Sequence, residues 1–401
     1  MGFPSIILLV AVSLVQTPAI ISLPSTVWAT SFSDAKAKPR GPATEQFHKG
    51  MSLLGKGDSK GAQAAFEKSL EVDPKHVGAL AGLAEALMQQ GHHKQAREKI
   101  QHALALQPKS GAVQQAWGRY LFAEKDFKKA EEAFHKAAQL DPKNASALTD
   151  LGNLYLGGFK HPDLAAKAFA SAVKLAPDNA NAHFGLGTSY SLLKKTNEAF
   201  TELDTAVRLD PKSLLAYLAM GNLHVEQKEY DQALDAYNAA LKIEPRFVDA
   251  AMAKGDVLAL KGRLDEAKQS YLAVLDVDPN RAPAYNNLAW IAVEQKGRLD
   301  DAVTWGKKAI SLAPSVGQFK DTLAWVYRAR GDLDQAAELL KAASTTGAGE
   351  PTIAYHLGVV LSEQGKKSDA MAAFRQAIKL QPNGAFVKDA EERIKTLAAV
   401  N

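Results

Sequence analysis

Apolar and small residues alternate with polar ones in two helical patterns that follow each other along residues 43 to 384. In the first pattern, Leu148, Leu151 and Tyr155 are spaced by three and four residues and share one helix face. In the second, Ala130 and Phe134 begin a similar apolar stripe. A short polar or glycine-containing segment separates the two patterns wherever they occur. The chain is therefore predicted to form pairs of antiparallel helices.

Prolines mark the end of the second pattern at nearly constant intervals. They are Pro74, Pro108, Pro142, Pro177, Pro211, Pro245, Pro279, Pro314 and Pro382. Successive intervals are 34 or 35 residues, and the last, of 68, equals two periods. Proline cannot continue a helix and disfavours helical geometry in the residue before it. A fixed period of this length is typical of a stacked array of repeats.

Residues 43–384 can be aligned as ten units that begin at residues 43, 77, 111, 145, 180, 214, 248, 282, 317 and 351, with one additional residue in the fourth and eighth units. A column is a position counted from the first residue of a unit, and several columns hold identical or similar residues. Column 8 is glycine or alanine throughout, and column 20 is alanine in every unit. The column-20 residues are Ala62, Ala96, Ala130, Ala165, Ala199, Ala233, Ala267, Ala302, Ala336 and Ala370. Small residues at these columns allow two helix backbones to approach closely, whereas the large residue at column 24 fills the space between units. A bulky residue at column 20 is therefore expected to overpack the helix pair.

These columns resemble the tetratricopeptide repeat, and the resemblance covers residues 43–384. It implies an all-α fold, a right-handed superhelical α-solenoid of about ten helix hairpins in which the first helix of each pair lines the concave side. Residues 385–401 place Phe386, Ala390 and Ile394 on one face, which suits a C-terminal capping helix. Two stretches beginning "NNLAWIAVEQ" and "DTLAWVYRAR" are also similar to repeat proteins of bacterial envelope assembly, exopolysaccharide export and protein sorting.

The ninth unit departs from the pattern. The segment "STTGAGEPT" at 344–352 replaces the usual proline ending, and Pro351 is expected to open the next helix. Gly347 and Gly349 add backbone freedom, so the junction is interpreted either as a hinge or as an irregular but rigid turn.

The N-terminus has a different composition. Residues 3–29 carry no charge and contain the apolar run "IILLVAVSLV", and Val27 and Ala29 stand where a signal peptidase would cut. We interpret residues 1–29 as a signal peptide and 30–42 as a flexible linker. The alternative is an uncleaved inner-membrane anchor through residues 3–28, because basic residues follow the apolar run and none precedes it. Export to the periplasm or cell envelope is the expected localisation.

Composition and motifs favour a protein without catalytic activity. The chain has 48 basic and 44 acidic residues, a balance that favours no nucleic-acid partner, and it has no cysteine. No phosphate-binding loop, nucleophile elbow or His-Glu-x-x-His motif is present. The repeats also leave no span for a catalytic domain. We therefore expect no enzyme activity, no cofactor and no metal site.

Columns 2, 5, 9 and 12 form a second stripe on the first helices, which the family places on the concave wall. This stripe is apolar for a solvent-facing surface, and such patches usually mark binding sites. The predicted partner-binding residues are Arg119, Phe122, Asn153, Phe184, Asn222, Asn286, Trp290, Asp321, Trp325, Arg328 and Tyr355. Trp290 and Trp325 occupy the same column of adjacent units. They are interpreted either as a stacking platform or as ordinary core residues.

Two functions follow from this stripe. The first is an exported adaptor that binds extended or helical segments of other proteins in its groove. The second is a polysaccharide-binding protein that stacks sugar rings on Trp290 and Trp325. Membrane contact is expected only through an uncleaved N-terminal segment.

Overall fold

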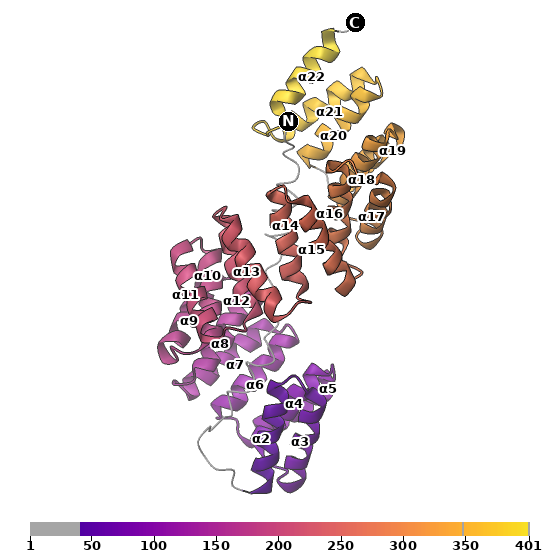
Figure 1. Cartoon of the computed structure of the whole chain (residues 1–401). Helices are drawn as coiled ribbons and strands as arrows, with labels where there is room; N and C mark the ends of the chain where they lie inside the picture. Colours follow the sequence, from indigo (N-terminus) through magenta and orange to yellow (C-terminus); the bar gives the residue numbers. More distant parts are fainter. Residues whose placement is uncertain (1–40, 347–348, 400–401) are drawn as a thin grey trace. The chain divides into compact units, whose positions relative to one another are not determined.

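The structure is a computed structural model that describes residues 41–346 and 349–399. The predicted signal peptide, nearly all of the predicted linker, and Gly347 lie outside these residues. The described residues form 21 α-helices and one π-helix, and no strand occurs among them. The predicted fold class, an all-α array of helical hairpins, is confirmed. Figure 1 shows neighbouring helices following one another along the chain.

The contacts divide the described chain into two compact units, 41–223 and 224–399, with the boundary inside α12. The helices up to this boundary are α2 (Pro42–Gly55), α3 (Ser59–Val72), α4 (Val77–Gln89), α5 (His93–Leu106), α6 (Gly111–Ala123), α7 (Phe127–Leu140), α8 (Ala145–Asn153), η2 (Leu154–Phe159), α9 (Pro162–Leu175), α10 (Ala180–Leu192), α11 (Thr196–Leu209) and α12 (Leu214–Glu226). The later helices are α13 (Tyr230–Ile243), α14 (Val248–Leu260), α15 (Leu264–Val277), α16 (Ala282–Glu294), α17 (Leu299–Leu312), α18 (Gly317–Arg330), α19 (Leu333–Thr346), α20 (Pro351–Glu363), α21 (Lys367–Leu380) and α22 (Val387–Ala399).

Helices pair through the small residues of columns 8 and 20. All ten alanines of column 20 are completely buried. At column 8, a Cβ atom added to Gly118 would lie 2.6 Å from the ring of Phe134. The same addition to Gly255 would lie 2.6 Å from the ring of Tyr271. The predicted close approach of the two helices is confirmed.

The aromatic residue of column 24 packs between consecutive units. The ring of Phe66 on α3 is fully buried. A Cβ atom added to Gly50 on α2 or to Gly82 on α4 would lie 2.5 Å from this ring. One side chain therefore fixes the distance from its own first helix and from the next one.

Each first helix ends at a residue in the left-handed backbone region. These residues are Gly57, Gly91, Lys125, Lys160, Lys194, Lys228, Gly262, Lys296, Gly331 and Gly365. The predicted helix break near column 15 thus occurs in all ten units. Glycine has no Cβ penalty in this conformation, whereas lysine does.

The additional residue of the fourth unit is contained in a π-helix. Residues Leu154–Phe159 continue α8 with wider turns, and the N–H of His161 donates to the carbonyl oxygen of Tyr155 at 2.8 Å. Pro162 then begins α9, as expected from its missing N–H. π-helices are rare and occur mostly as single turns inside α-helices.

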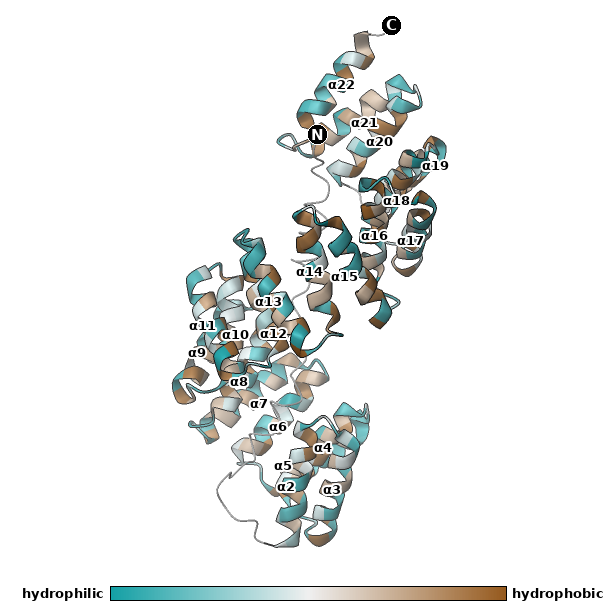
Figure 2. Cartoon of the chain, in the orientation of Figure 1, coloured by the Kyte–Doolittle hydropathy of each residue, from teal (hydrophilic) through white to brown (hydrophobic). Residues whose placement is uncertain are grey.

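First helices are buried more extensively than second helices. In the second unit, α4 buries ten of its 13 residues and α5 buries three of its 14. Figure 2 shows the same contrast, with α14 coloured more hydrophobic than α15. The reason is that a first helix packs against its own partner, the preceding second helix and neighbouring first helices. Side chains on first helices are therefore held in position from several sides.

The C-terminal end follows the same packing. Pro351 stands at the start of α20, as predicted. After the tenth pair, α22 packs on α21, with Phe386 and Ala390 buried. It covers the surface that another repeat would otherwise occupy.

Candidate partner-binding face

The eleven predicted residues all lie on first helices. They are Arg119 and Phe122 on α6, Asn153 on α8, Phe184 on α10, Asn222 on α12, Asn286 and Trp290 on α16, Asp321, Trp325 and Arg328 on α18, and Tyr355 on α20. Six of them are half-buried. Arg119, Asn153, Asn286, Asp321 and Trp325 are each at most 9% exposed. Helical spacing predicts which side chains share a face, but it does not show how closely the neighbouring first helices cover that face. The partner-contacting role of these residues stays a prediction.

A recurring contact connects consecutive first helices. A residue at column 9 meets the residue at column 6 of the next unit, 31 residues later. Arg119 Nε donates to Asp150 Oδ2 at 2.6 Å, and Asn287 Nδ2 donates to Asp256 Oδ1 at 3.0 Å. The rings of Trp325 and His356 lie 4.2 Å apart between centroids. We call this arrangement the cross-repeat contact.

Column 5 takes part in two of these contacts. Gln115 Nε2 donates to Asp150 Oδ2 at 2.6 Å, and His356 Nδ1 lies 2.7 Å from Asp321 Oδ1. Residues at columns 5 and 9 are one helical turn apart and lie on the same face. In both places, two side chains of one first helix therefore hold one side chain of the next.

Two buried carboxyl groups lie beside Arg119 and form what we call the acidic cluster, Glu85, Arg119 and Asp150. Arg119 is 3% exposed, and its guanidinium pairs with Asp150 Oδ2. Burial raises the pKa of Glu85 well above its ordinary value, Arg119 opposes this effect, and Asp150 adds to it. Asp150 Oδ1 and Glu85 Oε1 have no hydrogen-bond partner.

A second polar group surrounds Asp256 on α14. The hydroxyl of Tyr271 donates to Asp256 Oδ1 at 2.7 Å, and burial of that hydroxyl, together with the Asp256 charge, raises the pKa of Tyr271. Asn286 Nδ2 donates to Asn287 Oδ1 at 3.2 Å, which links Asn286 to Asp256. The Oδ1 atom of Asn286 is buried without a partner.

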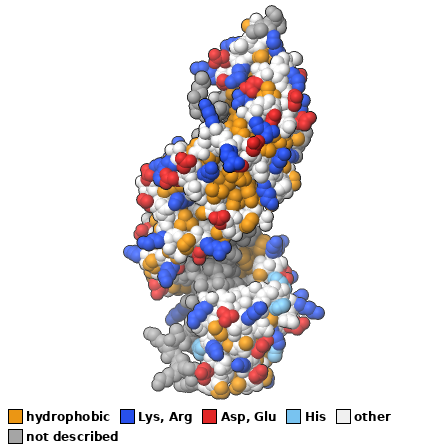
Figure 3. All heavy atoms as spheres, turned by 45° about the vertical axis from the view of Figure 1, so that its right-hand side comes forward, with side chains coloured by type: hydrophobic (Ala, Val, Ile, Leu, Met, Phe, Trp, Pro, Cys, Tyr) orange, Lys and Arg blue, Asp and Glu red, His pale blue; other side chains and the backbone are white. Residues whose placement is uncertain are grey.

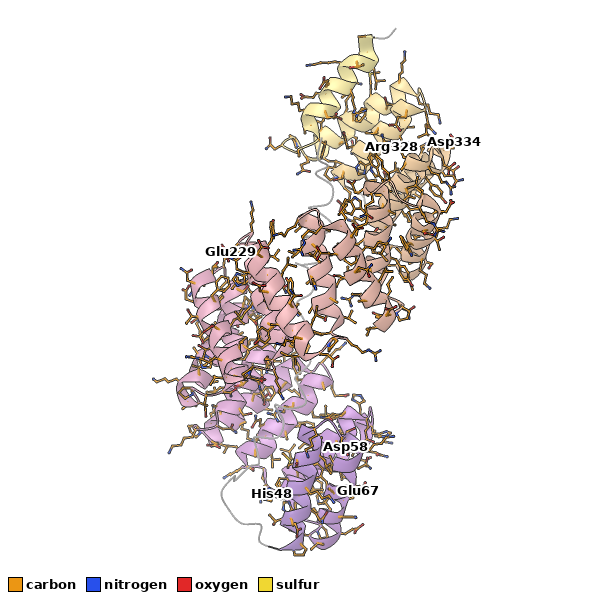
Figure 4. The ribbon with its side chains drawn as sticks, viewed as in Figure 1. His48, Asp58, Glu67, Glu229, Arg328 and Asp334 are labelled. Carbon is orange, nitrogen blue, oxygen red and sulfur yellow. The ribbon has the colours of Figure 1, made fainter. Side chains whose placement is uncertain are left out.

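The C-terminal group is built around Trp325. The guanidinium carbon of Arg328 lies 4.4 Å from the ring centroid of Trp325, and His356 lies 4.2 Å from it. Both groups therefore lie against the ring of Trp325, which is 9% exposed. Arg328 Nε also donates to both carboxylate oxygens of Glu363, at 3.0 and 2.9 Å. Figure 4 labels Arg328 in this part of the chain. Trp325 is therefore held as a packed residue.

Tyr355 connects the last repeat to the capping helix. Its hydroxyl donates to Asp389 Oδ2 at 2.6 Å, and burial together with this carboxylate raises the pKa of Tyr355 to about 12. Burial acts to raise the pKa of Asp389, but hydrogen bonds from Tyr355 and Arg393 outweigh it, so the pKa of Asp389 is lowered. Tyr355 consequently stays neutral across the physiological range and fixes α22 to α20.

Unpartnered acceptors are concentrated on the first helices. Among the described residues, four buried side-chain oxygen atoms have no hydrogen-bond partner. Three of them belong to Glu85, Asp150 and Asn286, at columns 9, 6 and 5 of first helices, and the fourth belongs to Gln364. Buried acceptors without donors are costly, and each calls for an explanation.

The remaining surface favours no other class of site. In the described part of the chain, no group of three His, Asp or Glu side chains is arranged to hold a metal ion. Over residues 41–346 and 349–399, every helix is too short or too polar to cross a membrane. Figure 3 shows Lys and Arg side chains interspersed with Asp and Glu on the visible face.

Sequence reasoning missed Glu85, Asp150, His356 and Glu363. A signal for one of these contacts was available in the repeat columns. Residues of opposite charge at columns 9 and 6, 31 positions apart, could have identified the Arg119–Asp150 pair before the structure was known. The contact between Arg328 at column 12 and Glu363 at column 13 of the next unit follows no column pattern that could have predicted it.

Comparison with known families gives the classification. Family models described as tetratricopeptide repeat match residues 53–118, 112–144, 159–213, 218–279, 261–316 and 322–385. One of these models by itself covers more than half of the chain. The chain belongs to the tetratricopeptide repeat family. The tetratricopeptide scaffold supports a role as a protein-interaction adaptor.

Several solved structures are similar to this tetratricopeptide protein. MamA is 27% identical over 41% of the chain and 96% of its own length, with a TM-score of 0.38. YrrB, described as a TPR protein with an unusual peptide-binding site, is 26% identical over 46% of the chain and 94% of its own length, with a TM-score of 0.39. PilF of Pseudomonas aeruginosa is 20% identical over 52% of the chain and 94% of its own length, with a TM-score of 0.44. No curated protein sequence matches the chain.

Proposed function

We propose that this tetratricopeptide protein is a non-catalytic adaptor that binds segments of partner proteins on its first helices. The helix pairs occupy nearly all of the described residues, and cross-repeat contacts hold the side chains of columns 5, 6 and 9 in place. A surface that is already ordered loses little conformational freedom when a ligand binds. The eleven predicted residues, among them Asn286 and Trp290, are the proposed contact residues.

The observation that carries this proposal is the tetratricopeptide array, whose first helices keep half-buried apolar side chains such as Phe122, Phe184 and Trp290 on the predicted stripe. Apolar side chains that are only partly covered by their own chain can pack against the apolar residues of a polypeptide segment.

Contacts at Trp325 favour a polypeptide over a polysaccharide. Sugar recognition by stacking needs an open aromatic face. Trp325 is 9% exposed, and Arg328 and His356 both lie against its ring, so a sugar could stack there only after these neighbours had moved. Binding of oligosaccharides is therefore kept as an outcome of the test below.

The test is a titration of the purified chain with two panels, one of envelope-protein peptides and one of oligosaccharides, followed by tryptophan fluorescence. We expect saturable binding of peptides. Replacement Phe184→Ala should weaken this binding by about fivefold or more, because it removes a half-buried apolar side chain from the proposed face. The matched control is Leu209→Ala, at an exposed position of the second helix α11. Binding of oligosaccharides alone, or of no peptide at all, would overturn the proposal.

We further propose that the adaptor acts after export, in envelope assembly, exopolysaccharide export or protein sorting. Support comes from the uncharged segment 3–29 and from the sequence similarities of the later repeats. Intact-mass measurement of chain recovered from the periplasm should show loss of residues 1–29. An uncleaved chain in the inner-membrane fraction would favour the anchor through residues 3–28, and an uncleaved chain in the cytoplasm would contradict export.

A further inference from the structure

Trp290 on α16 differs from the other described tryptophans in what lies against its ring. Each of the others has a cation or an aromatic ring there, namely Arg328 on Trp325, Lys268 on Trp305 and Tyr120 on Trp117. Trp290 has neither among the described residues, although its side chain is half-buried on the first-helix stripe. An aromatic ring without such a partner can accept a cation from another molecule.

Glu294 ends the same helix, one turn after Trp290. Side chains four residues apart lie on one helix face, so the carboxyl group and the ring are neighbours. Glu294 is half-buried and makes no hydrogen bond or ion pair with any described residue. Burial raises the pKa of Glu294, and no positive group of the described chain opposes this effect. The helix therefore places a ring and a carboxyl group side by side, and neither is paired with a cation.

The next repeat shows how this chain combines a tryptophan, a cation and a carboxylate. Arg328 lies 4.4 Å from the ring centroid of Trp325, and its Nε donates to both carboxylate oxygens of Glu363 at 3.0 and 2.9 Å. In the repeat of Trp290, the column of this arginine holds Val293. A basic group from outside the chain would complete a similar arrangement on α16, with the carboxylate coming from the helix of the tryptophan itself.

We propose that Trp290 and Glu294 form a subsite for a lysine or arginine side chain of the bound partner segment. This inference rests on the proposed adaptor function and specifies the chemistry of one position in its ligand. A cation is attracted both by the face of the ring and by the carboxylate. A neutral sugar could stack on the ring, but it would take water from the carboxylate without compensating its charge.

The experiment begins with a phage-displayed library of random short peptides selected against the full chain. Enriched peptides are then synthesised in three forms, with the basic residue kept, replaced by a neutral analogue (citrulline for arginine, norleucine for lysine) or replaced by glutamate. Calorimetry measures the affinity of each form for the unmodified chain and for Glu294→Gln, Glu294→Lys and Trp290→Leu. The matched control is Glu338→Gln, which removes an exposed carboxylate from the second helix α19.

We expect the basic form to bind the unmodified chain about tenfold more tightly than the neutral form. In Glu294→Gln and in Trp290→Leu this preference should fall below about threefold, whereas Glu338→Gln should behave like the unmodified chain. In Glu294→Lys the preference should reverse, so that the glutamate form binds more tightly than the basic form.

Peptides that bind equally well without a basic residue would overturn the subsite and leave the adaptor function standing. A preference for the basic form that survives in Glu294→Gln or in Trp290→Leu would have the same consequence. A library that yields no binding peptide would overturn the adaptor function itself, whether or not an oligosaccharide binds.

Discussion

At the scale of single residues, alanine at column 20 is determined by the distance between two backbones. All ten of these alanines have no exposed surface, and at column 8 a Cβ atom added to Gly118 or Gly255 would collide with the column-24 ring of the same pair. Interiors packed this closely respond to one added methylene group. The strict alanine column is therefore a packing requirement of every helix pair.

Enlarging a column-20 residue should destabilise the chain. We expect Ala165→Leu on α9 to lower the free energy of unfolding by roughly 1–3 kcal/mol, because the larger side chain must displace α8 or η2. The same change at Ala170, which is exposed on the same helix, is the matched control. Chemical denaturation followed by circular dichroism measures both. Equal effects at the two positions would contradict this account of column 20.

Residues that end the first helices provide a second test. Lys125 adopts a φ of 62° and Gly91 a φ of 79° at equivalent positions. An L-residue in this conformation costs about 1–2 kcal/mol, part of which is offset because glycine makes the unfolded chain more flexible. We expect Lys125→Gly to stabilise the chain by up to about 1 kcal/mol and Gly91→Lys to destabilise it similarly. Denaturant midpoints of the two variants, measured side by side, should move in opposite directions.

Glu85 should make stability depend on pH. Its pKa is raised in the folded chain from an ordinary value of 4.5, so the folded state holds a proton that the unfolded state has lost at intermediate pH. Stability from this group is therefore present below the ordinary value and is lost as the pH rises toward the folded pKa. We expect Glu85→Gln to raise the melting temperature near pH 8 and to have little effect near pH 4. A constant difference across the pH range would show that Glu85 is not the titrating group.

At the scale of elements, the sequence predicted the helices and their pairing more completely than the contacts between pairs. The repeat period, the regularly spaced prolines and the alanines of column 20 were sufficient to predict the hairpins. Each of these signals reflects a constraint that a residue type places on the backbone near it. The π-helix at Leu154–Phe159 was not predicted, since an insertion can be absorbed in a turn or within a helix. The burial of Asp321 was not predicted, and a core position for Trp325 was only one of two alternatives, because burial depends on side chains 30 or more residues away.

A second set of contacts joins neighbouring repeats at the surface. An aspartate at the second position of a second helix meets the last residue of the next first helix or the residue directly after it, 30 positions later. The pairs are Asp231–Lys261 at 2.6 Å, Asp265–Gln295 at 2.9 Å, Asp300–Arg330 at 3.1 Å and Asp334–Gln364 at 2.7 Å. An acid near a helix N-terminus is also favoured by the helix dipole. Exposed pairs such as these contribute little to stability. They recur at the same positions of successive repeats.

The capping helix offers a test at this scale. Removal of residues 385–401 exposes the surface of α21 and deprives Tyr355 of its bond to Asp389. We expect faster hydrogen exchange in α20 and α21, by about tenfold or more, with no change in α4 to α7. Exchange measured by mass spectrometry on the intact and shortened chains makes this comparison. A uniform acceleration along the chain would contradict the capping role.

At the scale of the whole molecule, the described chain is a series of similar interfaces. Within each compact unit, neighbouring pairs pack through the column-24 residue, which is large in every repeat except the eighth, where it is Gly306. Several junctions add a cross-repeat contact or a surface pair. Stability in such a series is approximately a sum of intrinsic and nearest-neighbour contributions. The polar clusters around Asp150, Asp256 and His356 therefore occupy separate repeats and can be altered one at a time.

The widened turn at Leu154–Phe159 has a consequence for how chains of this kind change in length. One surplus residue is accommodated inside six residues, and α9 still begins at Pro162 with Ala165 in its fully buried place. Helices before and after the insertion keep their phase relative to the columns. Single-residue insertions at the ends of first helices can therefore accumulate without a compensating deletion, so homologous chains need not preserve a uniform period in order to preserve their packing.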